Sequence, residues 1–211
     1  NCIIMDTGST TTSIIPIVNG RVEVRGKTDL EKLSNGELVY TGASRTNVAA
    51  VVQVIPVKGR LVKVSSEFFA STGDVHIILG HLTEKEHTVD TADGRGKNIE
   101  ACMARLARAV CADMEMLKEE EIVEMAEYVA GKQVENIVEA LKQVLGRGEF
   151  TNTGRKNLST VVTGLGKKFL AAKAAEKIGL KCIDLDELID VEASKLTPAL
   201  ALALMVAYRY D

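Results

Sequence analysis

The stretch I-I-M-D-T-G-S-T-T-T, residues 3–12, runs from an apolar segment straight into an aspartate, a glycine and a row of hydroxyl residues. Ile3 to Met5 predict a buried strand, and Gly8 allows a tight turn. Because further isoleucines follow, the stretch is typical of a β-hairpin whose tip offers N–H groups, hydroxyl groups and one carboxylate. Such a tip suits a phosphate group and its magnesium ion. A Thr-rich hairpin without a ligand is the alternative, since short glycine-containing motifs recur by chance.

The composition limits the class of protein. The chain has 211 residues, of which 46% are hydrophobic and 26% charged, so it can build the core of one large or two small domains. A net charge of −3 without a long basic run argues against a nucleic-acid-binding surface. No apolar run approaches the roughly 18 residues of a membrane span, and no signal-peptide pattern is present. The four cysteines match no zinc or C-x-x-C pattern, which indicates reduced thiols in a cytoplasmic protein.

Alternating apolar and polar residues predict a β-rich first third. We expect strands at residues 2–6, 12–18, 21–24, 37–40, 51–55 and 60–64. The dipeptide Asn19-Gly20 supplies the type I′ turn signal of a hairpin. A short helix is expected over residues 28–33, capped by Thr28 or Asp29.

Helical and strand patterns alternate over the rest of the chain. The pattern is broken between residues 66 and 96, where Val75 to Leu79 fit either a short buried helix or a strand. Apolar residues recur at helical spacing over residues 97–146, with a change of helix at Leu117. The last third predicts a βαβ unit followed by a further helix. We expect a strand at 158–162, a glycine turn at 163–166, a helix at 167–178, a strand at 181–184 and a helix at 199–206.

Three pieces of the chain occur in an informative order. The hairpin comes first, the segment V-V-T-G-L-G at residues 161–166 follows as a strand that ends in a glycine turn, and T-P-A-L-A at residues 197–201 opens a closing helix. This order resembles the second lobe of the actin, sugar kinase and Hsp70 superfamily. In that superfamily a D-x-G-[ST]-T hairpin holds phosphates, and a later glycine turn meets the nucleotide.

Further motifs narrow the resemblance to the hydantoinase/oxoprolinase-related branch, which is linked to tetrahydromethanopterin-dependent one-carbon metabolism. They occur in the branch's order over almost the whole chain, which makes the resemblance specific. The motifs are D-T-G-S-T-T-T at 6–12, G-E-L-V-Y-T-G at 36–42 with Arg45-Thr46, T-A-D-G-R-G at 91–96, R-L-A-R at 105–108 before Asp113, and V-V-T-G-L-G at 161–166.

The resemblance implies an α/β fold, namely an RNase H-like lobe with an antiparallel hairpin at its start, inserted helices over about 97–146 and a C-terminal βαβ unit. Members of the branch normally carry an earlier lobe with its own D-I-G-G-type loop, which is absent from this sequence. The chain also starts at Asn1 and enters a strand pattern two residues later. We therefore expect residues 1–211 to be the single C-terminal lobe of a two-lobed protein whose N-terminal lobe is missing.

An activity is implied as well. The branch includes archaeal transferases of methanofuran biosynthesis, which join an aminomethyl-furanmethanol diphosphate to the phenol of γ-glutamyltyramine, form an aryl ether and release diphosphate. This implies magnesium as the cofactor, two small-molecule substrates, and no nucleic-acid or membrane partner, and it leaves homo-oligomerisation open. An ATP-dependent kinase or a hydantoinase/oxoprolinase-type amidohydrolase is the alternative, with ATP as a ligand. A non-catalytic nucleotide-binding regulator is the second alternative.

Within this resemblance each motif receives a role. The catalytic residues are expected to be Asp6, which holds the magnesium ion directly or through water, Asp93 as the base for the phenol, and Arg45 and Arg95 as charge clamps. The residues expected to bind phosphate are Thr7, Gly8, Ser9, Thr10, Thr11, Gly164 and Gly166.

Each of these roles has a structural alternative. Asp6 is also explained as a turn-capping carboxylate, and Arg45 as a tie between its loop and a carboxylate. The pair Asp93 and Arg95 is also explained as an ion pair that holds a turn.

The histidines and two lysines leave further alternatives open. His76, His81 and His87 lack a tight metal-ligand spacing, so a zinc site, a general base and plain packing are all compatible with the sequence. Lys167 and Lys168 lie at a predicted helix start, where positive charge opposes the helix dipole. Their position indicates either a nearby anionic ligand or lysines that face solvent.

Overall fold

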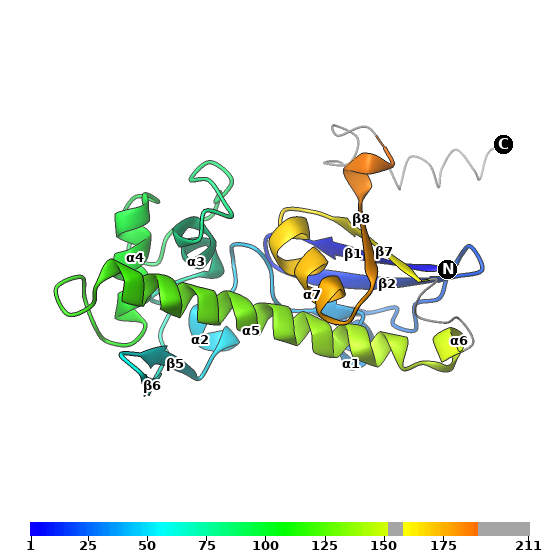
Figure 1. Ribbon diagram of the computed structural model, residues 1–211, viewed down its shortest axis with the longest axis horizontal. Helices are drawn as coiled ribbons and strands as arrows, with labels where there is room; N and C mark the ends of the chain where they lie inside the picture. The colour runs from blue at the N-terminus through cyan, green and yellow to red at the C-terminus, as the bar shows by residue number, and fades with distance from the viewer. Residues whose placement is uncertain (152–157, 190–211) are drawn as a thin grey trace.

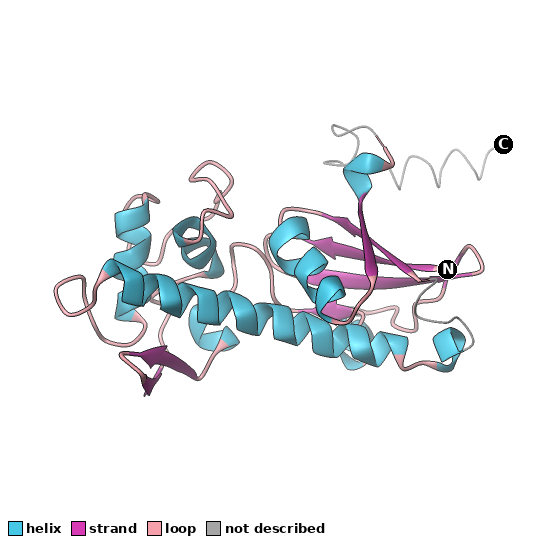
Figure 2. Cartoon of the chain, in the orientation of Figure 1, coloured by secondary structure: helices cyan, strands magenta, loops and turns pink. Residues whose placement is uncertain are grey.

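The structure, a computed structural model, describes residues 1–151 and 158–189. The helix expected over residues 199–206 lies outside these residues. One end of the molecule contains a mixed β-sheet, the other contains short helices and a small hairpin, and one long helix runs along both (Figures 1 and 2). The expected α/β class is therefore confirmed. In the described part of the chain, no helix has both the length and the apolar character that crossing a bilayer requires.

The sheet begins as an antiparallel hairpin and continues as parallel strands. Its order is β3-β2-β1-β7-β8, with β4 also paired to β2. The β1–β2 and β2–β3 pairs are antiparallel, whereas the β1–β7 and β7–β8 pairs are parallel. The predicted hairpin and βαβ unit are thus both present, and they meet where β1 pairs with β7. The strands are β1 (Cys2–Thr7), β2 (Thr12–Val18), β3 (Arg21–Val22), β4 (Leu38–Val39), β7 (Ser159–Thr163) and β8 (Lys181–Asp184).

Local sequence signals explain the turns around this sheet. Asn19 and Gly20 adopt φ angles of 51° and 74°, as the predicted type I′ turn requires. Helix α1 (Asp29–Ser34) begins after Thr28, whose side chain accepts a hydrogen bond from the Glu31 N–H. The Glu31 carboxylate in turn accepts from the Thr28 N–H, which completes a capping box.

The middle of the chain differs in part from the prediction. The strand expected at 51–55 is wrong at its start, because Asn47 caps a short helix, α2 (Val48–Val51), before β5 (Val54–Val57) pairs with β6 (Arg60–Lys63). The open choice for residues 75–79 is resolved as helix α3 (Thr72–Ile78). The predicted helical region consists of α4 (Ile99–Arg108) and α5 (Glu119–Leu145), followed by the short α6 (Gly148–Thr151).

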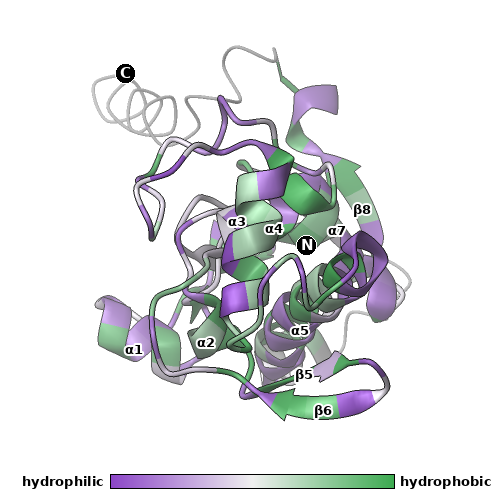
Figure 3. Ribbon diagram, turned by 90° about the vertical axis from the view of Figure 1, so that its left-hand side faces the viewer, coloured by the Kyte–Doolittle hydropathy of each residue, from purple (hydrophilic) through white to green (hydrophobic). Residues whose placement is uncertain are grey.

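Helix α5 joins two hydrophobic cores. Its first half, from Ile122 to Val129, packs with α3, α4 and the β5–β6 hairpin, whereas its second half, from Val134 to Leu145, packs with the sheet. Hydrophobic and hydrophilic residues alternate around its surface (Figure 3), which is the pattern of a helix with buried faces. The two cores are therefore held on one rigid element.

The βαβ unit closes the described part of the chain. After β7, the chain forms a π-helical turn, η2 (Lys167–Ala171), which continues as α7 (Ala172–Lys177) and leads through Gly179 into β8. A short 3-10 helix, η3 (Leu185–Glu187), follows β8. The helix predicted over 167–178 is confirmed, with a wider first turn than an α-helix.

Candidate functional site

The tip of the first hairpin, residues 8–11 (the hairpin tip), is closed by buried threonines. The Gly8 N–H donates to the Thr11 carbonyl at 2.9 Å, and the Thr7 and Thr12 hydroxyl groups are hydrogen-bonded to each other with 3.2 Å between their oxygens. Both Thr7 and Thr12 are fully buried. The Thr7 hydroxyl is therefore used inside the hairpin, and the predicted phosphate-binding role of Thr7 stays a prediction.

The other hydroxyl groups of the hairpin tip are accessible. Ser9, Thr10 and Thr11 are half-buried, and the Ser9 and Thr10 hydroxyl oxygens lie 3.4 Å apart. Within residues 1–151 and 158–189, neither hydroxyl has another hydrogen-bond partner. The hairpin tip thus has neighbouring accessible hydroxyl groups, and their predicted role in binding phosphate stays a prediction.

A second segment, residues 41–46 (the supporting loop), lies along the hairpin tip. The Ala43 N–H donates to the Gly8 carbonyl at 2.9 Å, and the Ser44 and Arg45 N–H groups both donate to the Ser9 carbonyl. Arg45 is exposed, so the structure places this predicted charge clamp beside the hairpin tip. Its role stays a prediction.

The predicted glycine turn after β7 meets the base of the hairpin. Gly164 has a φ of 87°, and a Cβ there would lie 2.5 Å from Asp6 Oδ1 and from the Thr7 carbonyl oxygen. The Gly166 N–H donates to the same Thr7 carbonyl at 2.8 Å, and the predicted phosphate-binding role of Gly166 stays a prediction. The turn instead lets β7 approach Asp6 closely.

Replacing Gly164 by alanine tests this close approach. The left-handed backbone costs a non-glycine residue roughly 1–2 kcal/mol, and the contacts with Asp6 and Thr7 add to that cost. Gly179→Ala is a matched control in the same βαβ unit, because φ is 74° there and a Cβ would meet nothing within 4 Å. We expect Gly164→Ala to lower the free energy of unfolding, measured by urea titration, at least about twice as much as Gly179→Ala. Equal losses would contradict the packing of Gly164 on Asp6.

The Asp6 carboxylate is the most unusual group of this region. It sits at the end of β1, opposite Ser13 on β2 and Thr163 on β7, and it is half-buried. Burial raises the pKa of its carboxyl group. In the part of the chain that the structure describes, no donor forms a hydrogen bond or an ion pair with it. A half-buried carboxylate without a partner is costly, and a cation is the ligand that would compensate it.

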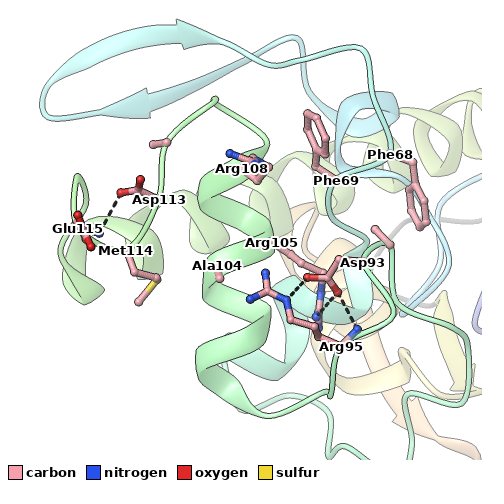
Figure 4. A pocket seen from close by; sticks show the side chains of 12 residues that line it. Phe68, Phe69, Asp93, Arg95, Ala104, Arg105, Arg108, Asp113, Met114 and Glu115 are labelled. Atoms are coloured by element: carbon pink, nitrogen blue, oxygen red, sulfur yellow. Dashed lines mark hydrogen bonds and ion pairs between the residues drawn. The ribbon is translucent and has the colours of Figure 1, made fainter.

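Asp93 and Arg95 lie in a second cluster, before α4, around a pocket of about 600 Å³. Figure 4 shows the Asp93 carboxylate in contact with both Arg95 and Arg105 of α4, with Phe68 and Phe69 on another wall. Arg105 is only 2% exposed and binds Asp93 at 3.0 Å. The sequence motifs at 91–96, 105–108 and 113 thus line one pocket.

Arg105 also binds a fully buried carboxylate, that of Asp74 on α3, at 2.8 Å. Its remaining donors reach the Gly96 carbonyl and the Cys102 sulfur, so its guanidinium group is saturated by the chain itself. Burial raises the pKa of the Cys102 thiol to about 12, which leaves it protonated and excludes a thiolate nucleophile there.

The pairing of Asp93 bears on its predicted role as a base. Burial alone would raise the pKa of its carboxyl group, but hydrogen bonds from Arg95 and the charge of Arg105 lower it below the ordinary value. A lower pKa makes the carboxylate a weaker base. The structural alternative, an Asp–Arg pair that holds the turn, agrees with the 2.7 Å contact between Asp93 and Arg95.

The supporting loop connects the two clusters. The Thr72 N–H donates to the Thr46 carbonyl at 2.8 Å, and the Gly73 N–H donates to the Ser44 carbonyl at 3.2 Å. Helix α3 therefore carries Asp74, the partner of Arg105, on one side and touches the supporting loop on the other. Among the described contacts, Asp93 is thus linked to the hairpin tip indirectly. The link runs through Arg105, through helix α3 with Asp74, and through the supporting loop.

The three histidines do not gather around one point. His76 and His81 are joined by their Nδ1 atoms at 3.1 Å, whereas His87 is buried with its ring against Gly73. Among the described residues, no three histidine, cysteine or acidic side chains form a group that could hold a metal ion. The zinc alternative for the histidines therefore finds no support. A magnesium ion at Asp6 needs no such group, since magnesium commonly uses one carboxylate, water and substrate phosphates.

We expect the buried His76 to make the free energy of unfolding depend on pH. Burial lowers its pKa from 6.5 to about 3, so between these values the unfolded chain binds more protons than the folded chain. Stability from this residue is complete above pH 6.5 and is lost as the pH falls toward 3. We expect the wild type to lose about 2 kcal/mol more than His76→Gln between pH 7.5 and pH 5, measured by urea titration at each pH. Parallel curves for the two proteins would contradict a neutral buried His76.

The contacts of Lys167 explain the positive charge at the start of the helix that follows β7. Its Nζ binds Asp184 at 2.8 Å and also binds Asp186, while Lys168 is exposed. The anionic partners of Lys167 are thus the carboxylates of Asp184, the last residue of β8, and Asp186 in η3, and no external anion is required.

Sequence reasoning missed several residues of these clusters. Ser71 and Asp74 form a capping box, a pattern that is visible in S-T-G-D at 71–74 and could have identified the start of α3. No local signal marks Gln133, a fully buried amide on α5 that reaches Thr41 and Gly42.

Comparison with known proteins agrees with these motifs. Residues 1–208 match the family model described as hydantoinase/oxoprolinase. A "(4-{4-[2-(gamma-L-glutamylamino)ethyl]phenoxymethyl}furan-2-yl)methanamine synthase" of Methanocaldococcus jannaschii is 38% identical over 211 residues. The match covers the whole chain and 61% of that relative's length.

A second relative, from Methanococcus vannielii, carries the same name. It is 34% identical over 209 residues, which cover 98% of this chain and 90% of the relative. The family match extends over nearly the whole chain and includes the hairpin tip, the supporting loop and the glycine turn. The chain therefore belongs to the hydantoinase/oxoprolinase family.

Proposed function

We propose that the hairpin tip and Asp6 bind a magnesium-bound diphosphate, and that the chain belongs to a transferase of methanofuran biosynthesis. The reaction joins an aminomethyl-furanmethanol diphosphate to the phenol of γ-glutamyltyramine. One observation carries the proposal: the half-buried Asp6 carboxylate, which has no partner among the described residues, comes just before a hairpin tip with accessible hydroxyl groups. The names of the two relatives, each a synthase of a phenoxymethyl-furan amine, support this choice of substrates.

The strand order supports the finer fold assignment. An antiparallel β3-β2-β1 hairpin meander followed by parallel β7 and β8 is the arrangement expected for an RNase H-like lobe of the actin, sugar kinase and Hsp70 superfamily. The hairpin tip and the glycine turn lie at the same end of this sheet, because β1 and β7 are parallel and pair Asp6 with Thr163. Such a lobe offers phosphate ligands at that end.

The chemistry requires one bond to break and one to form. The bond between the furfuryl carbon and the diphosphate oxygen breaks, and the phenol oxygen bonds to that carbon while its proton leaves to a base. The furan ring oxygen can stabilise positive charge on the carbon, so the protein has to bind the diphosphate, exclude water and orient the phenol.

The residues of the hairpin tip suit the leaving group. The negative Asp6 would repel a free diphosphate, so it fits only a diphosphate whose charge a metal ion compensates. Magnesium, when bound, would neutralise the charge that develops on the diphosphate. Ser9, Thr10 and Thr11 would donate hydroxyl hydrogen bonds to phosphate oxygens, and Arg45, whose N–H donates to the Ser9 carbonyl, would add a cation.

The second pocket suits the other substrate. Its aromatic wall of Phe68 and Phe69 and its exposed Arg95 could hold an acceptor that combines an aromatic ring with a carboxylate. Asp93 lines this pocket and pairs with Arg95. We propose that its carboxylate acts as the base for the phenol. The proposal includes magnesium as the cofactor, two small-molecule substrates and a cytoplasmic location.

A direct assay tests the proposed function. The full-length protein is incubated with the furan diphosphate, γ-glutamyltyramine and magnesium, and the aryl ether and released diphosphate are quantified. We expect both products in equal amounts and none after chelation of magnesium. ATP turnover without aryl ether would instead favour the kinase or amidohydrolase alternative, and tight ATP binding without turnover would favour a regulator.

A further inference from the structure

Gln133 lies fully buried near the middle of α5, where a polar side chain is costly unless every polar atom is bonded. Its Nε2 donates to the Thr41 hydroxyl at 2.8 Å and to the Gly42 carbonyl at 2.9 Å. Its Oε1 lies 3.0 Å from His76 Nε2. Both the amide NH₂ group and the amide oxygen are therefore hydrogen-bonded, and their partners lie on opposite sides of the amide.

The partners of Gln133 fix which way its amide points. The Gly42 carbonyl only accepts hydrogen bonds, so the amide NH₂ must face it and the amide oxygen must face His76. His76 Nε2 therefore carries its proton, and His76 Nδ1 accepts from His81 Nδ1, 3.1 Å away. His81 is stacked on Phe169, with ring centroids 4.9 Å apart. A neutral His76 thus holds the amide in one orientation.

The residues that Gln133 binds belong to the supporting loop. Gly42 packs on the hairpin tip so closely that a Cβ would lie 2.5 Å from the Thr10 nitrogen. The Thr41 carbonyl accepts from the Thr12 hydroxyl at 3.0 Å, and the Gly42 carbonyl also accepts from the Thr72 hydroxyl. One side chain of α5 is therefore bonded to the segment that sits directly on the candidate diphosphate site.

We propose that Gln133 is a positioning residue for the hairpin tip. It holds the supporting loop against Ser9 and Thr10, and the His76–His81 pair keeps its amide in the bonding orientation. The position of the hydroxyl groups that receive the ligand is thereby set by the long helix that joins the two cores. This inference rests on the proposed function in one respect, namely that the hairpin tip is the diphosphate site.

Amide hydrogen exchange tests the positioning without any ligand. Gln133→Met keeps the size of the side chain and removes its hydrogen bonds. We expect exchange at Ala43, Ser44 and Arg45 to become at least about tenfold faster, since two hydrogen bonds to the supporting loop are lost. Gln143→Met is the matched control, because Gln143 lies on the same helix and donates to the Ser34 carbonyl at 2.8 Å, away from the hairpin tip. Unchanged exchange at these three amides in folded Gln133→Met would overturn the proposal.

A second variant covers the case in which Gln133→Met does not fold. Gln133→Glu keeps an acceptor for His76 Nε2 and loses the two donors to Thr41 and Gly42. We expect the same faster exchange in the supporting loop when the introduced carboxyl group is ionised. Exchange as slow as in the wild type, at a pH at which this carboxyl group is ionised, would overturn the proposal in this variant as well.

Binding of magnesium diphosphate separates this inference from the proposed function. Calorimetry on the full-length protein should give a dissociation constant at least about tenfold higher in Gln133→Met than in the wild type, and an unchanged one in Gln143→Met. Equal affinities in the wild type and Gln133→Met would overturn the positioning role. A wild type that does not bind magnesium diphosphate would contradict the proposed function, and the exchange experiment then decides on Gln133 alone.

Discussion

Replacing Arg105 by methionine is expected to lower the free energy of unfolding by about 3–5 kcal/mol, measured by urea or guanidinium titration. Arg105 is 2% exposed, and its partner Asp74 is fully buried, with 2.8 Å between Arg105 Nη2 and Asp74 Oδ1. Methionine fills much of the space but removes the positive charge beside the Asp74 carboxylate, which keeps its neutral capping bonds from Ser71. An uncompensated charge in this position is far more costly than the loss of an exposed pair.

Two further variants show whether the buried charge causes the loss. Asp74→Asn in the Arg105→Met background removes the uncompensated carboxylate, so the double variant should be more stable than Arg105→Met alone. Lys132→Met is the control. It breaks an ion pair with Glu135 that has a similar contact distance of 2.7 Å, but both of its side chains are exposed, so stability should stay nearly unchanged. If the double variant were no more stable than the single one, packing of the arginine rather than its charge would explain the effect.

The sequence predicted those parts of the fold that depend on local signals. The hairpin of β1 and β2 follows from alternation and from the Asn19-Gly20 turn, and α1 follows from the Thr28 capping box. The strand expected at 51–55 was wrong at its start because Asn47 caps a short helix there, and a run of alanine and valine is compatible with both structures. Local propensity could not decide between them, whereas packing on α5 does.

The candidate site was predictable only where its residues are neighbours in sequence. Asp6 and the hairpin tip lie in one motif and were identified together. The Asp74–Arg105 pair joins residues 31 positions apart, and the bond from Gln133 to Thr41 spans 92 positions. Such contacts leave no periodic pattern in a single sequence, because they arise when α3, α4 and α5 pack together.

The same distinction applies to the predicted phosphate ligands, whose roles stay predictions. Thr7 and Gly166 belong to the right motifs, but the Thr7 hydroxyl and the Gly166 N–H are consumed by contacts inside the chain. The motif residues thus divide into those that build the hairpin and those that remain available to a ligand. Asp6 is in the second group, since no described residue binds its carboxylate.

Replacing Asp6 by asparagine is expected to reduce diphosphate-dependent turnover of the full-length protein by a factor of about a hundred or more. Asparagine keeps the size of the side chain and removes the charge that attracts a metal ion, and a lost metal contact at a leaving group costs roughly several kcal/mol of transition-state stabilisation. The fold should persist, because the carboxylate makes no hydrogen bond or ion pair with another described residue that asparagine would break. Burial raises the pKa of Asp6, so an uncharged side chain is also easier to accommodate there.

Melting temperature and turnover measured on the same Asp6→Asn preparation separate a ligand-binding role from a structural one. For ligand binding we expect a melting temperature equal to or above that of the wild type, a large loss of turnover, and weaker dependence of the remaining activity on magnesium. Asp29→Asn, in the exposed first turn of α1, serves as a control and should change neither quantity appreciably. A structural role of Asp6 requires the opposite pattern, namely a lower melting temperature with nearly normal turnover per folded molecule. A stable Asp6→Asn protein with unchanged turnover would exclude Asp6 from the reaction, because the half-buried charge would then be dispensable both for the fold and for the diphosphate.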